Sequence, residues 1–100
     1  MSEQMSNEII YHEDCDEIWI QKFQLGVSVK YHFTWFVNEE IKYTQAISSD
    51  WFTYDDLKIE LSRFADYISG WEKPNRSIPN INGEMMGYKK PFKLQRLQDW

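Results

Sequence analysis

The chain has 100 residues, a length that suits one domain, 1–100, and a formal net charge of −5 at pH 7. Hydrophobic residues make up 42% of the sequence and aromatic residues 17%, which is typical of a folded core and not of a disordered chain. An acidic body repels the phosphate backbone, so the composition argues against direct nucleic-acid binding.

The sequence also indicates the cellular compartment of the protein. No stretch approaches the roughly 20 apolar residues of a membrane span, and residues 1–17 contain neither Lys nor Arg nor the apolar centre of a secretory signal. Cys15 is the only cysteine, which excludes an internal disulfide and fits a reducing environment. We therefore expect a cytoplasmic protein with no membrane attachment.

In chain order, the first elements predict an antiparallel meander. Residues 1–7 are polar and expected to be frayed, and strands are expected at about 9–12, 18–25, 27–37 and 41–47. The pattern is clearest in 27–37, where every odd position is apolar, from Val27 to Val37, and the even positions are mostly polar. Because alternate side chains point to opposite faces, this strand should bury one face and expose the other.

A helix is predicted over 54–69. Thr53 is placed to cap its N-terminus, with Asp56 three residues later and Phe52 and Leu57 in the two positions of a hydrophobic staple. Gly70 is expected to end the helix in a left-handed conformation. The apolar stripe consists of Leu57, Leu61, Phe64, Ala65 and Ile68.

The last third of the chain carries weaker signals. Residues 71–90 predict an irregular connection, and the alternation of Phe92, Leu94 and Arg96 indicates a short last strand around 91–97. The expected fold class is thus α+β, an antiparallel meander of three to four strands with one amphipathic helix packed on one face.

Few residues are candidates for a catalytic or metal-binding role. His12 and Cys15 have H-x₂-C spacing and His32 lies downstream, whereas a zinc site normally takes two close pairs of ligands. Cys15 stands within the acidic run 13–17, whose charges disfavour a reactive thiolate. We expect no enzymatic activity, no cofactor and no metal, and a small Cys/His enzyme is the least favoured alternative.

Charge provides the functional prediction. Residues 1–70 carry 13 acidic and five basic side chains, so the net charge of this part is −8. A compact acidic body is drawn to basic surfaces, which predicts a small inhibitor that blocks a basic protein partner, a toxin or a nucleic-acid-handling protein. In size, charge and lack of catalytic motifs the chain is similar to toxin immunity proteins and phage anti-defence proteins.

The candidate partner-binding residues are five acids in turns and one tryptophan: Glu39, Glu40, Asp50, Trp51, Asp55 and Asp56. We expect the hairpin with Glu39 and Glu40 to share a surface with the helix start, around Trp51 as an apolar anchor. Two alternatives stay open. The acids serve only to keep a small domain in solution, or the chain is an assembly subunit that forms a homodimer through a strand edge or through Trp51, Trp71 and Trp100.

Overall fold

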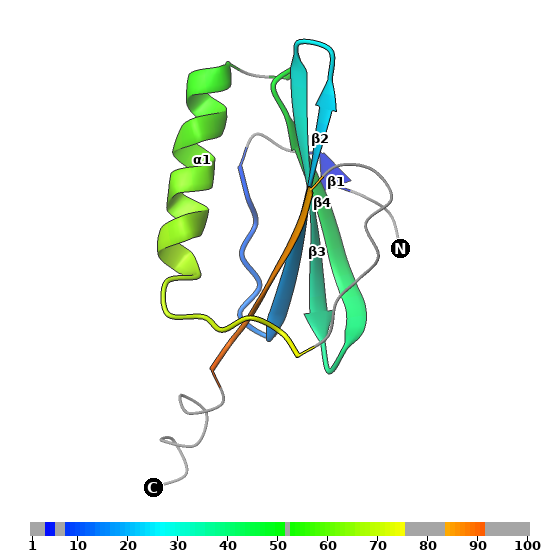
Figure 1. Cartoon of the computed structure of the whole chain (residues 1–100), viewed down its shortest axis with the longest axis vertical. Coiled ribbons are helices and arrows are strands. Elements are labelled where there is room, and N and C mark those ends of the chain that lie inside the picture. The colour runs from blue at the N-terminus through cyan, green and yellow to red at the C-terminus, as the bar shows by residue number, and fades with distance from the viewer. Residues whose placement is uncertain (1–3, 6–7, 52, 76–83, 92–100) are drawn as a thin grey trace, which may run out of the picture.

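The computed structural model describes residues 4–5, 8–51, 53–75 and 84–91, which form one sheet with one helix on one of its faces (Figure 1). The elements are β1 (Gln4–Met5), β2 (Glu17–Leu25), β3 (Ser28–Val37), β4 (Glu40–Ser48), α1 (Tyr54–Tyr67) and β5 (Glu84–Lys89). Within these residues the sheet has five strands in the order β1-β4-β3-β2-β5. Antiparallel hairpins join β2, β3 and β4, so the α+β meander is confirmed.

Two tight turns join the hairpins. At the β2–β3 turn Gly26 has φ +63° and Val27 does not have positive φ, which is the pattern of a type II′ turn. At the β3–β4 turn both Asn38 (φ 52°) and Glu39 (φ 68°) are left-handed, as in a type I′ turn. Asn tolerates this conformation, whereas Glu39 occupies the position that glycine normally fills.

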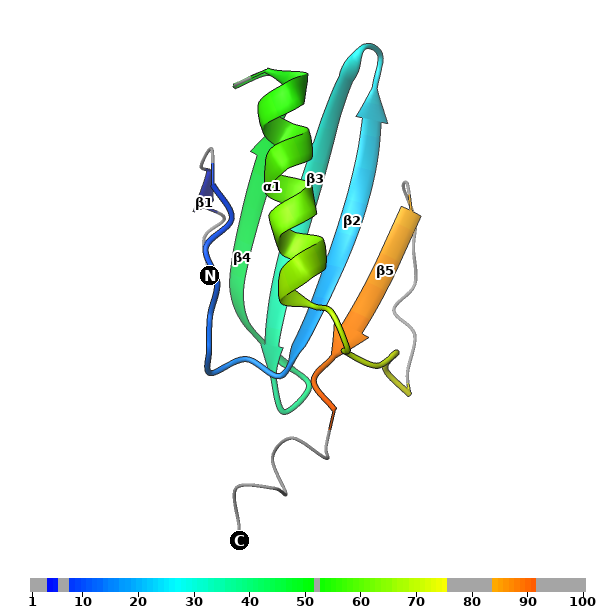
Figure 2. The ribbon, with the colours of Figure 1, turned by 90° about the vertical axis from the view of Figure 1, so that its left-hand side faces the viewer.

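The predicted strand at 9–12 is wrong, although this segment does lie beside β4 (Figure 2). The backbone here is held by side chains instead of by a ladder. The amide of Gln45 accepts from the N–H of Ile10 at 2.8 Å and donates to the carbonyl of Glu8, and Glu60 accepts from the N–H of Ile9 at 3.1 Å. The strand at this edge is β1, in the segment expected to be frayed, and it pairs with β4 in parallel.

A second correction concerns 71–90, expected to be irregular, because β5 lies within it and pairs antiparallel with β2. Its sequence has a glycine in the middle and no β-branched residue, so it gave no strand signal. Gly87 is needed for packing: a Cβ there would lie 2.6 Å from atoms of the Trp19 indole. Apart from Pro91, which is not in a strand, the strand expected at 91–97 lies outside the described residues.

The main core lies between the sheet and α1. Its side chains with no exposed surface are Ile18, Phe33, Trp35, Ile47 and Leu57. The opposite face of β3 was predicted to be in solvent, and this is wrong at Thr34 and Phe36, which are buried together with Trp19 of β2. The reason is that β2 begins with apolar residues on both faces and Trp19 pairs directly with Thr34. Val27, predicted to be buried, is fully exposed in its turn.

The helix follows its sequence signals closely. Thr53 caps it, since its hydroxyl accepts from the N–H of Asp56 at 3.1 Å, while Phe52 of the predicted staple lies outside the described residues. The helix ends at Tyr67, two residues earlier than predicted, and Gly70 follows with φ +87°. The buried stripe includes Glu60 and not Ala65, which is exposed.

Candidate partner-binding surface

The structure separates the predicted binding residues into two groups. Glu39 and Glu40 lie at the β3–β4 turn, beside the end of the molecule where α1 finishes. Asp50, Trp51, Asp55 and Asp56 lie at the opposite end, where α1 begins (Figure 2). The whole of β4 runs between them, a span of about 27 Å at the usual rise per residue. The prediction that the two acidic turns share a surface is therefore wrong.

The tip of the β2–β3 hairpin lies at the same end of the molecule as the predicted binding residues near the start of α1. The hydroxyl of Ser28 donates to Asp50 at 2.5 Å. The N–H of Ser49 donates to the Val29 carbonyl, and the Ser49 hydroxyl accepts from the Val29 N–H, both at 3.0 Å. These bonds hold the turn before α1 against the hairpin. We call the resulting end of the molecule the distal surface; it consists of Leu25, Val27, Asp50, Trp51, Tyr54, Asp55 and Asp56.

The distal surface combines apolar area with negative charge. Its large apolar side chains are unusually accessible, with 100% of Val27, 58% of Leu25, 56% of Tyr54 and 39% of Trp51 exposed. Asp55 and Asp56 are exposed in the first turn of α1, where negative charge is favoured by the helix dipole. Asp55 and Asp56 form no ion pair with any residue in the described part of the chain.

Three of these residues were missed from the sequence. Leu25 and Val27 were assigned to strands, and Tyr54 was taken only as the first residue of the helix. A signal for Val27 existed, because glycine at the first central position of a two-residue turn places the next residue at the hairpin tip. The exposure of Tyr54 follows from its position on the outer side of the first helical turn, where Lys58 lies 4.8 Å from the ring centroid.

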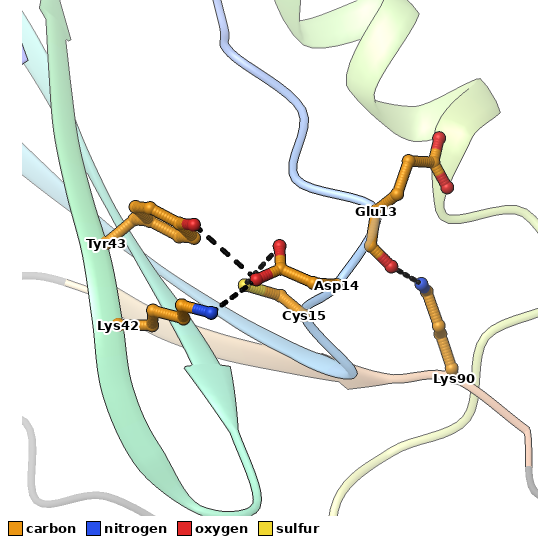
Figure 3. A network of polar contacts seen from close by, with 6 residues as sticks. All are labelled: Glu13, Asp14, Cys15, Lys42, Tyr43 and Lys90. Carbon is orange, nitrogen blue, oxygen red and sulfur yellow. Dashed lines mark hydrogen bonds and ion pairs between the residues drawn. The ribbon is translucent and has the colours of Figure 1, made fainter.

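Of the residues considered for chemistry, Cys15 lies near the β3–β4 end of the molecule, away from the distal surface (Figure 3). Cys15 is 1% exposed, and its thiol is 3.9 Å from a carboxylate oxygen of Asp14. Burial, with a smaller contribution from Asp14, raises the pKa of the Cys15 thiol to about 11. The thiol is therefore protonated at neutral pH. The sequence argument rested on the neighbouring charges alone, whereas burial is the larger cause.

The neighbours of Cys15 are occupied by structural contacts. Asp14 accepts from Lys42 at 2.6 Å and from the hydroxyl of Tyr43 at 3.4 Å, and Lys90 donates to the carbonyl of Glu13 at 2.9 Å (Figure 3). The lysine bond holds the pKa of Asp14 below its usual range. These polar groups bind segments of the fold to one another.

The histidines do not meet at a common site. His12 stacks on Tyr43 with ring centroids 3.7 Å apart, and burial lowers the pKa of its imidazole. His32 lies on the sheet face that α1 does not cover, because it alternates with Phe33 of the main core. A polar hollow of about 410 Å³ beside the β3–β4 turn contains neither histidine. Within the described ranges, no group of three or more His, Cys, Asp or Glu side chains is arranged to hold a metal ion.

Comparison with protein-family models, curated protein sequences and solved structures gives no significant match. Among the described residues, no helix is long and apolar enough to cross a membrane.

Proposed function

We propose that this chain is a non-enzymatic binding protein that blocks a basic protein partner through its distal surface. One observation supports the proposal above all others: exposed Val27, Leu25 and Trp51 lie at the same end of the molecule as exposed acids of the first helical turn. Apolar anchors within a polar rim are the usual anatomy of a protein-binding hot spot. A toxin or a nucleic-acid-handling protein is the class of partner whose basic site an acidic surface of this kind would cover.

The two kinds of residue have different roles in binding. Negative charge at Asp50, Asp55 and Asp56 attracts a basic surface over about one Debye length and so raises the association rate. The apolar side chains act only after contact, when their burial slows dissociation. Binding should therefore show an association rate that falls with added salt and a dissociation rate that depends on Trp51.

Charge reversal at the two ends of the molecule provides the matched experiment. The full chain is used to capture proteins from its native host, and the captured protein is identified, purified and measured by surface plasmon resonance over a salt series. The double variant Asp50→Lys/Asp55→Lys should slow association roughly tenfold at low salt. The control Glu39→Lys/Glu40→Lys changes the net charge equally at the opposite end and should have a much smaller effect. Trp51→Ala should mainly speed dissociation.

Each variant requires a thermal melt, because Asp50 accepts from Ser28 and Asp55 lies at the helix N-terminus. Equal slowing by both double variants would show that only net charge matters and would overturn the proposed surface. The proposed surface would also be overturned if Trp51→Ala captured the partner as well as the wild type does, or if the association rate did not depend on salt. A symmetric dimer whose formation is abolished by Trp51→Ala would replace the inhibitor by an assembly subunit.

A further inference from the structure

The tip of the β2–β3 hairpin carries exposed apolar side chains that the stability of the fold does not require. The two residues with the largest exposed fractions among the large apolar side chains, Val27 at 100% and Leu25 at 58%, flank Gly26 in its type II′ turn. The turn itself needs only the glycine, because positive φ is required at that one position. A fully exposed valine buries no surface on folding, so the hydrophobic effect gives it no role in the stability of the chain alone.

The tip is also held rigidly. The pairing of β2 with β3 continues without interruption to Leu25 and Ser28. The side-chain amide of Gln24 donates to the carbonyl of Gly26 at 3.0 Å, across the turn. The hydroxyl of Ser28 fastens the hairpin to Asp50. A rigid tip loses little conformational entropy when it is bound, so its apolar area is converted efficiently into affinity.

The tip projects beyond the strands on its flank. β5 pairs with β2 only over residues 17–22, so the part of the hairpin from Phe23 to the turn has no described strand beside it there (Figure 2). A projecting and narrow element of this shape fits a concave site, whereas a flat apolar patch would fit a flat one. Asp50, which accepts from the Ser28 hydroxyl at the base of the tip, would then lie at the rim of that concave site.

From this arrangement we infer that the β2–β3 tip inserts Val27 and Leu25 into an apolar pocket of a protein partner, and that Lys or Arg side chains surround the pocket. The inference rests on the proposed function, because it names what the distal surface recognises. Charge complementarity determines the rim. Asp50 accepts from Ser28 of the hairpin, and Asp55 and Asp56 lie at the same end of the molecule, so a pocket rimmed by acids would be repelled. Trp51 contacts the partner beside the pocket and not within it.

The test uses the full chain with a photo-cross-linking amino acid at position 27 or, as the control, at position 41. Ile41 is a β-branched residue at the opposite end of the molecule, and its exposed fraction, 54%, is close to the 58% of Leu25 at the tip. Cross-linking is carried out in the native host, and the partner peptide joined to the chain is sequenced. We expect adducts from position 27 and none from position 41, and the joined peptide should contain apolar residues next to Lys or Arg.

The partner identified in this way is then purified for binding measurements. Val27→Thr keeps the shape of the side chain and replaces one methyl by a hydroxyl, and Val27→Ser removes most of the apolar area. The Val27→Ser variant should bind roughly tenfold more weakly and Val27→Thr by an intermediate factor, whereas Ile41→Thr should bind like the wild type.

The two proposals fail in different ways. If Trp51→Ala weakens binding to the identified partner but Val27→Ser and Leu25→Ser do not, the inserted tip is wrong and the distal surface stands. If neither Trp51 nor the tip affects binding, both proposals are wrong. A joined peptide that is uniformly polar or acidic also overturns the apolar pocket, because the adduct then reports contact without insertion.

Discussion

Replacing Gln45 with leucine tests how the N-terminal segment is held. Gln45 is 1% exposed, and its amide binds two backbone groups of one segment, the N–H of Ile10 and the carbonyl of Glu8. Leucine has a similar volume, so packing is largely retained while both backbone groups lose their partner. A buried unsatisfied group costs about 1–3 kcal/mol. Glu8 and Ile10 are themselves exposed and can recruit water, which places the expected loss near the lower limit, about 2 kcal/mol in total.

Urea denaturation measures that loss, and hydrogen exchange at the Ile10 amide locates it. The exchange should accelerate at least tenfold in Gln45→Leu, because the amide loses its acceptor. Gln24→Leu is the matched control: its amide also donates to backbone carbonyls, but it is exposed, and its loss should cost less than about 0.5 kcal/mol. Unchanged stability together with unchanged protection of Ile10 would show that Gln45 does not hold the segment.

Three further substitutions test other features of the fold. Gly87→Ala should destabilise the domain by about 1–3 kcal/mol in urea denaturation, because the new Cβ would overlap the buried Trp19 indole; an effect below 0.5 kcal/mol would refute that contact. Glu39→Gly should stabilise it by about 0.5–1 kcal/mol, because glycine adopts φ 68° without strain; a loss of stability would contradict the type I′ turn. The raised pKa of Cys15 means that the folded state holds the thiol proton more tightly than the unfolded state. Its contribution to stability is therefore fully present below pH 9 and is lost as the pH rises to about 11. Cys15→Ala should flatten the stability profile in that range, and identical profiles for the two proteins would exclude a buried thiol.

The central hairpins and the helix could be predicted because their signals are local. Alternation in 27–37 defines β3, and Thr53 defines the start of α1. The strand wrongly predicted at 9–12 and the strand β5 that was missed both depend on contacts distant in sequence. Residues 9–12 resemble a strand but are held by the side chain of Gln45, 35 residues away from Ile10. The segment of β5 contains a glycine that is explained only by Trp19 on the neighbouring strand.

The proposed binding surface could be predicted only where its residues are close in sequence. Asp50, Trp51 and Asp55 are close in sequence and remain close in the fold, because a short turn joins β4 to α1. The prediction that Glu39 lies near these residues was wrong, because placing it requires both the direction and the length of β4. A strand of nine residues necessarily carries its two ends to opposite sides of a small sheet.

The charges at the two ends of the sheet are only partly alike. Glu39 and Glu40 at the β3–β4 turn are exposed beside Ile41, but other charged groups at that end bind segments of the fold together. Near the β3–β4 end, Asp14 is paired with Lys42, and Lys90 reaches across to the backbone of Glu13. These contacts connect the segment before β2 to β4 and to the chain after β5, so they serve the fold. At the distal end, Asp55 and Asp56 lie in solvent beside apolar side chains that are equally exposed. Simple solubility would be served by acids without Val27 and Trp51, and core packing would be served by apolar residues without exposure. The distal end differs from the β3–β4 turn in having four large exposed apolar side chains, Leu25, Val27, Trp51 and Tyr54, where the turn has Ile41. In the function that we propose, a partner buries these groups and neutralises the acids.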